Sequence, residues 1–126
     1  MKRTRCNRAP AGVLLLNKLN NPFNFGIGEK IKILLNTNGV FTTKELALNS
    51  EYYGSVTAGD VDNDGDLDLF ITTNQSINKF MINDGKANFT YDKELYPNTL
   101  YNKGFFASEL YDMDNDGYLD LVTAGH

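Results

Sequence analysis

Two acidic segments of nearly identical sequence begin 52 residues apart, at Asp60 and Asp112, in this chain of 126 residues. They read DVDNDGDLDL and DMDNDGYLDL. A second pattern, an apolar run followed by an Asn/Gly turn and then Phe-Thr, occurs at residues 33–42 and again at 81–90, with Ile33 aligned to Met81. Self-similarity at such a period is typical of repeat proteins, in which one supersecondary unit stacks on the next to bury its apolar face. The sequence therefore predicts an array of repeated units.

The residues around these patterns have the period of β-strands. Leu67, Leu69 and Ile71 occupy every second position after the first acidic segment, as in a strand whose side chains point alternately to two faces. No long stretch has a helical period, and only Thr43–Leu48 is compatible with a single helical turn. We therefore predict an all-β chain built of four-stranded antiparallel meanders. In the complete unit the predicted strands are Ser55–Gly59, Leu67–Thr73, Lys79–Ile82 and Phe89–Lys93.

The repeat divides the chain into unequal parts. Residues 54–96 read as one complete unit and residues 104–126 as the first two strands of the next. The repeat region begins near residue 29 with the end of a preceding unit, and residues 1–28 form an atypical N-terminus that could add one more strand. About two units are fewer than the roughly 4–8 blades with which a β-propeller closes. We therefore expect a fragment of a larger propeller, with further blades needed for closure.

The acidic segments have the spacing of a cation-binding loop. Aspartates stand at loop positions 1, 3, 5 and 9, and a glycine stands at position 6, where a sharp turn is needed. Carboxylates about 4 Å apart repel by roughly 4 kcal/mol at an effective dielectric constant near 20, so their convergence requires a cation. Ca²⁺, which accepts about 6–8 oxygen ligands in flexible geometry, fits better than Mg²⁺. Position 7 differs between the copies, as expected where only the backbone carbonyl is a ligand. The predicted ligands of two Ca²⁺ sites are Asp60, Asp62, Asp64, Asp66 and Asp68, and Asp112, Asp114, Asp116, Tyr118 and Asp120.

Alternative structures for the acidic segments fit the sequence less well. Clusters of Asp, Asn and Gly also occur in ordinary solvated turns, but two near-identical copies argue against such turns here. An EF-hand needs an acid at position 12 and flanking helices, whereas this position holds Ile71 or Thr123 and both flanks resemble strands. The same flanks exclude the helical dockerin type. Thrombospondin type-3 repeats need disulfides, which the single cysteine, Cys6, cannot form.

The segments resemble the FG-GAP/VCBS repeats, whose D-x-D-x-D-G-x-x-D-L loop matches both copies at every fixed position. The resemblance covers residues from about 29 to 126. It implies blades of a β-propeller like that of the integrin α-subunit head, with Ca²⁺ held in the loop between the first and second strands of each blade. Carried over position by position, the implied ligands are the residues named above.

Composition excludes several classes of function. The net charge is −4, and an acidic chain is a poor match for nucleic acid. The longest apolar run near the start, Val13–Leu16, is far shorter than a membrane span or the core of a signal peptide. The net negative charge of the chain comes from the two predicted sites, because without the eight proposed carboxylate ligands the chain has more basic than acidic residues. Such calcium modules bind at about 10⁻⁴–10⁻³ M, which predicts an extracellular, cell-surface or periplasmic location.

The sequence favours a binding module over an enzyme. The only histidine is the terminal His126, and no Ser-His or paired-Glu arrangement can be proposed, so we expect no catalysis by this chain. The predicted function is protein or glycan binding and adhesion, with calcium in a structural role. The alternative is the propeller portion of a secreted carbohydrate-active enzyme, a polysaccharide lyase or hydrolase, whose catalytic residues lie outside this chain. A purely architectural spacer is a third possibility.

Overall fold

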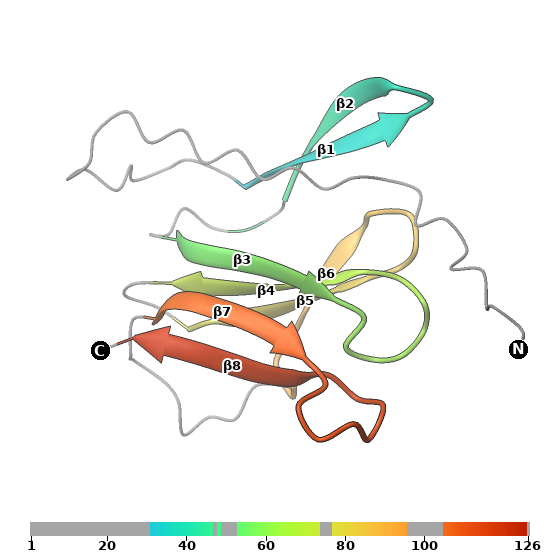
Figure 1. Ribbon diagram of the computed structural model, residues 1–126. Helices are drawn as coiled ribbons and strands as arrows, with labels where there is room; N and C mark the ends of the chain where they lie inside the picture. The colour runs from blue at the N-terminus through green and yellow to red at the C-terminus, as the bar shows by residue number, and fades with distance from the viewer. Residues whose placement is uncertain (1–30, 47, 49–52, 74–76, 96–104, 126) are drawn as a thin grey trace, which may run out of the picture.

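The computed structural model describes residues 31–46, 48, 53–73, 77–95 and 105–125, and within them all regular structure is β-strand. The strands form three antiparallel sheets in the orders β1-β2, β3-β4-β5-β6 and β7-β8 (Figure 1). The predicted all-β class is confirmed, while the predicted N-terminal region at residues 1–28 lies outside the described residues. The strands are β1 (Lys32–Thr37), β2 (Val40–Glu45), β3 (Tyr53–Gly59), β4 (Asp68–Thr73), β5 (Lys79–Asn83), β6 (Phe89–Asp92), β7 (Phe105–Tyr111) and β8 (Asp120–Gly125).

The central sheet is the meander that the sequence predicts for one complete unit. Its four strands follow one another in space in chain order, and every neighbouring pair is antiparallel. Both the first and the last residue of each observed strand lie within two residues of the predicted bounds. The largest difference is at β3, which begins at Tyr53 instead of Ser55 and contains a register shift between Tyr53 and Val56.

The β1–β2 hairpin turns at Asn38 and Gly39, whose φ angles are 52° and 87°. Two consecutive positive φ angles are the signature of a type I′ turn, which Asn-Gly favours and which matches the twist of the flanking strands. The amide of Gly39 also donates a hydrogen bond of 2.8 Å to Asn36 Oδ1. The hairpin continues through Thr43, which pairs with Leu34. The possible helical turn over Thr43–Leu48 is therefore wrong, because cross-strand pairing extends β2 to Glu45.

The hairpins β1–β2 and β5–β6 are equivalent. The difference in residue number between equivalent positions is 47 in their first strands and 48 in their second strands. Asn36 lies opposite Phe41 in the first hairpin, and Asn83 lies opposite Phe89 in the second. The second hairpin thus has one more residue between its paired positions. The alignment of Ile33 with Met81 is consequently wrong by one residue: Leu34 is the equivalent of Met81, and Ile33 is the equivalent of Phe80.

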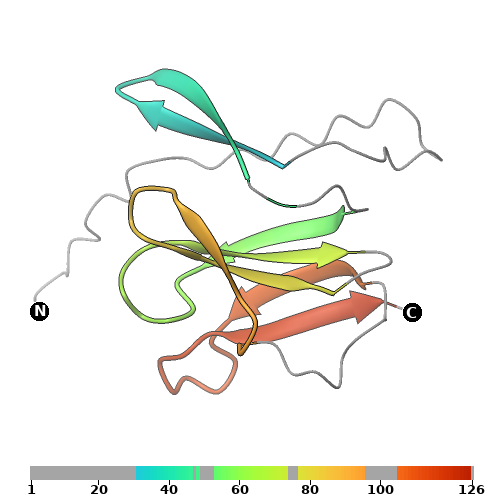
Figure 2. The ribbon, with the colours of Figure 1, turned by 180° about the vertical axis from the view of Figure 1, so that it is seen from behind.

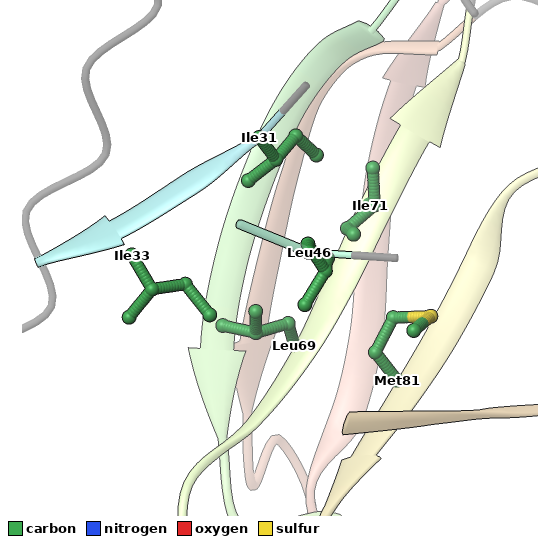
Figure 3. Packing of buried hydrophobic residues seen from close by; sticks show 6 residues of the cluster. All are labelled: Ile31, Ile33, Leu46, Leu69, Ile71 and Met81. Carbon is green, nitrogen blue, oxygen red and sulfur yellow. The ribbon is translucent and has the colours of Figure 1, made fainter. Parts of the chain in front are cut away.

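The three sheets lie in layers, with β1–β2 on one face of the central sheet and β7–β8 on the other (Figures 1 and 2). On the first face, Ile33 and Leu46 pack against Leu69, Ile71 and Met81 of the central sheet (Figure 3). Ile33 is fully buried there. Because neither sheet could bury this surface alone, the stacking of units supplies the core.

A second cluster lies on the opposite face of the central sheet. Phe70 and Phe80 are buried with their ring centroids 4.7 Å apart, and Leu110 and Leu121 from β7 and β8 pack against them. All six residues of β4 are buried as a result. β4 is therefore covered by a neighbouring sheet on each of its faces. Alternation in the sequence alone does not reveal this two-sided burial.

Candidate metal-binding loops

Each acidic segment forms a loop between two antiparallel neighbours. The first joins β3 to β4, and the second joins β7 to β8. The two loops lie at the same end of the molecule (Figure 1). The chain turns back in the first loop through Asn63 and Gly65, whose φ angles are 61° and 96°. The glycine at position 6 is therefore needed for its positive φ, as the sequence suggested.

Loop amides hold the carboxylates of the first loop in place. Asp60 accepts hydrogen bonds from the amides of Asp64 at 3.0 Å and Gly65 at 2.9 Å. Asp62 accepts a longer bond of 3.2 Å from the same Asp64 amide, and Asp64 accepts one of 2.9 Å from Asp66. These bonds orient the acids locally, while their remaining lone pairs stay available to a cation.

The second loop repeats the arrangement bond for bond. Asp112 accepts from the amides of Asp116 and Gly117 at 3.1 and 3.0 Å. Asp114 accepts from Asp116 at 3.2 Å, and Asp116 accepts from Tyr118 at 2.8 Å. The repeated letters of the sequence therefore specify a repeated geometry as well as a repeated composition.

The structure brings part of each predicted ligand set together. One carboxylate oxygen from each of three residues lies within 4.8 Å of the others, in two separate groups. The predicted ligand Asp64 lies outside the group of the first loop, and its carboxylate accepts a hydrogen bond from the Asp66 amide. The predicted ligand Asp120 lies outside the group of the second loop. Tyr118 is 64% exposed. The two groups are Asp60, Asp62 and Asp68, and Asp112, Asp114 and Asp116.

Asp66 occupies position 7, where the sequence predicts a carbonyl ligand with a variable side chain. Its carboxylate lies against Gly85 of the β5–β6 turn, in the space that a β-carbon at this glycine would fill. Gly85 itself has a φ of 75°. The side chain of Asp66 thus contacts the neighbouring hairpin, which is consistent with a ligand role limited to its backbone oxygen.

Asp68 connects the first loop to the sheet. It is fully buried, and its two oxygens accept hydrogen bonds from the amides of Val61 at 3.0 Å and Asn83 at 2.8 Å. Burial raises the pKa of the Asp68 carboxyl, while these two amides act in the opposite direction. The nearby charges of Asp62 and Asp64 raise it further. A bound cation would stabilise the charged form that burial disfavours.

Asn83 is the residue at this site that the sequence analysis missed. Besides its amide bond to Asp68, its side-chain nitrogen donates a bond of 3.1 Å to the carbonyl of Leu67, at the end of the loop. Its side-chain oxygen is buried without a hydrogen-bond partner. The signal in the sequence was weak, because Asn83 stands in a turn-like Asn-Asp-Gly run. Its role depends on the pairing of β4 with β5.

Asp120, the equivalent of Asp68, is differently placed. It accepts a bond of 2.8 Å from Met113, as Asp68 does from Val61. It is exposed, however, because no strand among the described residues pairs with the other edge of β8. The first loop is therefore fixed by three strands and the second by two.

The donors at both loops fit a hard divalent cation. They are carboxylate oxygens, with backbone carbonyls at hand, which is the ligand chemistry of Ca²⁺ and Mg²⁺ and not of softer metals. The orphaned oxygen of Asn83 adds an unsatisfied acceptor beside the first group. Each group of acids could bind one metal ion.

Stacked antiparallel sheets with acidic loops at one end define a β-propeller repeat protein. A sequence profile of the FG-GAP-like repeat matches residues 23–71 and 60–123, which together span most of the chain. The chain therefore belongs to the FG-GAP-like repeat family. No curated protein and no solved structure matches it. In the described part of the chain, no helix has the length and apolar character needed to cross a bilayer.

Proposed function

We propose that this chain is a calcium-binding β-propeller repeat module of an extracellular or cell-surface protein, non-catalytic and acting in protein or glycan binding. The observation that carries the proposal is the convergence of three carboxylates in each of two loops with the same hydrogen-bond pattern. Acids at such separations repel one another, and a divalent cation reverses the sign of that interaction.

The proposed role of the ion is structural. In the first loop the ligands come from both ends of the segment between β3 and β4, so one ion would tie the two strands together at their turn. Asp68 also reaches β5 through Asn83, which extends the tie to a third strand. An ion bound in this way would replace the repulsion between the carboxylates with attraction to the cation, and so hold the strand ends together at one end of the sheet.

The proposed location and partners follow from the expected affinity. Loops of this kind bind calcium at about 10⁻⁴–10⁻³ M, a concentration found outside cells. The end of the molecule that carries the loops would then be rigid only in that environment. A glycan array and pull-downs with calcium and with chelator test the binding role. Partner or glycan capture that requires calcium supports it, and no capture in either condition argues for an architectural role.

Calorimetric titration with Ca²⁺ tests the metal assignment. We expect two sites, one removed by Asp64→Ala and the other by Asp116→Ala, because each variant takes a carboxylate from one loop. Glu94→Ala, which removes an acid outside both loops, should leave both sites intact. A titration without heat, and without thermal stabilisation by Ca²⁺, would refute the assignment.

Terbium luminescence separates the two loops. Tyr118 stands in the second loop, where the first loop has Asp66. Tb³⁺ excited through tyrosine should therefore report on the second loop. We expect this signal to be lost in Asp116→Ala and kept in Asp64→Ala, and competition by Ca²⁺ should abolish it in the parent protein.

A further inference from the structure

The turn of the β1–β2 hairpin contains the only Asn-Gly pair in the sequence, Asn38-Gly39. The side-chain carbonyl of an asparagine in such a pair is open to attack by the next backbone nitrogen, because glycine has no β-carbon to hinder the approach. Both residues are exposed, so the water and base that the reaction needs can reach them. The turn therefore carries the reactive groups of a spontaneous reaction of the backbone.

The reaction is deamidation. The nitrogen of Gly39 gives its proton to base and forms a bond to the side-chain carbon of Asn38, Cγ. The bond from Cγ to the side-chain nitrogen, Nδ2, breaks, and this nitrogen takes up a proton and leaves as ammonia. Water then opens the five-membered imide ring at one of its two carbonyl carbons, which gives aspartate or isoaspartate. Water is the only co-reactant, and neither an oxidant nor a reductant is needed.

The structure restrains the attacking nitrogen. The amide of Gly39 donates a hydrogen bond of 2.8 Å to Asn36 Oδ1, so its proton is held in place. The turn also fixes the backbone of Asn38 at a φ of 52°, and the pairing of Thr37 with Val40 closes the turn on both sides. Ring closure requires rotation about the bond between Cα and the carbonyl carbon of Asn38. The folded turn therefore opposes the reaction until it opens.

We propose that Asn38 is a deamidation site of this chain, and that Asn36 sets the rate by holding the amide of Gly39. Asn36 is a positioning residue, since it acts on the nitrogen that attacks and is not itself changed. The chemistry takes place in the β1–β2 turn and uses no residue of the acidic loops. It is therefore independent of the calcium-binding function proposed above.

The two Asp-Gly pairs of the acidic loops can react in the same way, but the fold restrains both. Gly65 donates its amide to Asp60 at 2.9 Å, and Gly117 donates its amide to Asp112 at 3.0 Å. An aspartate is also less reactive than an asparagine near neutral pH, because a charged carboxylate resists attack by a nucleophile. These pairs should therefore convert more slowly than Asn38-Gly39.

The third Asp-Gly pair, Asp84-Gly85, is restrained at the group under attack. The carboxylate of Asp84 accepts hydrogen bonds from the amide of Lys86 at 2.9 Å and from Asn88 Nδ2 at 2.8 Å. These donors stabilise the charged carboxylate and fix its orientation. Asn38 combines a neutral, exposed side chain with a single restraint on the attacking amide, so it should react before all three aspartates.

The two products should affect the hairpin differently. Aspartate at this position keeps the turn, because Asp-Gly also favours type I′. Isoaspartate adds a methylene group to the main chain, and the register of a hairpin depends on the length of its turn. β1 carries Ile33, which is fully buried and packs in one cluster with Leu69 of the central sheet (Figure 3). Isoaspartate should therefore loosen this packing.

Peptide mass spectrometry after incubation at mildly alkaline pH measures the reaction at each described asparagine. Conversion of the amide to an acid raises the mass of the peptide, and an isoaspartyl methyltransferase labels the isoaspartate product. We expect Asn38 to convert first in the folded protein, and to convert faster when urea unfolds the chain. Three results would overturn the proposal: earlier conversion of another described asparagine, equal rates in the two states, or no conversion of folded Asn38 once the unfolded chain has converted.

Asn36→Ala tests the hydrogen bond to the amide of Gly39. Loss of one such bond should speed deamidation of the folded protein about 2- to 10-fold. In urea, where the bond is absent, the variant and the parent should react at the same rate. Asn36→Asp keeps an acceptor oxygen at this position and should react no faster than the parent. An unchanged rate in folded Asn36→Ala would contradict the role of Asn36.

Thr42→Ala is the matched control for a general weakening of the hairpin. It removes a long side-chain hydrogen bond of 3.5 Å to the carbonyl of Leu35, on the same two strands, and leaves the amide of Gly39 bound to Asn36. We expect a smaller acceleration than in Asn36→Ala. Equal acceleration in the two variants would mean that hairpin opening alone sets the rate, which overturns the role of Asn36.

Hydrogen exchange and thermal melting measure the effect on the hairpin. Protein enriched in the isoaspartate form should exchange the amides of residues 32–45 faster than fresh protein and melt at a lower temperature. Asn38→Asp should match fresh protein in both measurements, because it adds the charge without lengthening the main chain. An isoaspartate form that matches fresh protein would contradict the expected effect on packing.

Discussion

Asp68 and Asp120 occupy the same loop position with different surroundings, and alanine at each position should have unequal effects. Asp68→Ala leaves two amides without acceptors, those of Val61 and Asn83, inside a fully buried site. Each unsatisfied buried group costs about 1–3 kcal/mol. Part of this cost is offset because the variant also removes a carboxylate whose pKa burial raises. We expect a net loss of about 2–4 kcal/mol in the free energy of unfolding without calcium.

Asp120→Ala removes one bond, from the amide of Met113, at an exposed position. Water can replace that bond, so the expected loss is about 0.5–1.5 kcal/mol. Urea unfolding in chelator measures the free energy of unfolding of both variants. Equal losses, or a larger loss for Asp120→Ala, would refute the argument that the pairing of β4 with β5 makes the two positions different.

Four further results are expected. Phe70→Ala should lower the free energy of unfolding by about 3–5 kcal/mol in urea titrations, because the ring is fully buried against Phe80. Gly85→Ala should lower the melting temperature more than Gly39→Ala does: both glycines have positive φ, but only at Gly85 would the new methyl group overlap the Asp66 carboxylate. Calcium at about 100 times its dissociation constant should add about 2.7 kcal/mol of stability per occupied site, lost on chelation and measurable by calorimetric melting. Asn88 lowers the pKa of Asp84 below its ordinary value of 3.8, so the stability from this carboxylate is present above that pH and is lost as the pH falls through the lower folded pKa; Asp84→Asn should flatten this acid limb in urea titrations across pH.

The sequence predicted the fold well where local signals and tertiary structure agree. The acidic loops, the Asn38-Gly39 turn and the four strands of the complete unit are each encoded by residues close together in the chain. The family membership also followed from the loop letters. Turn chemistry and strand period act over a few residues, so predicting them needs no knowledge of what packs on top.

The sequence could not supply what depends on neighbouring layers. Alternation predicted β4 as a strand, but its burial on both faces arises from two other sheets. The alignment of Ile33 with Met81 failed by one residue because the longer turn of the second hairpin hides the true offset. Asn83 was missed for the same kind of reason, since its partner Asp68 lies on a different strand.

The placement of both acidic loops at one end makes the molecule electrically polar (Figure 1). Nine of its 16 acidic side chains stand between Asp60 and Asp68 or between Asp112 and Asp120. Without calcium, this end carries a concentrated negative potential that repels anionic surfaces and attracts cationic ones over about a Debye length of 10 Å at 0.1 M salt. Two bound divalent ions would neutralise four of these nine negative charges. The rise and fall of calcium would thus change which molecules approach this end, before any contact is made.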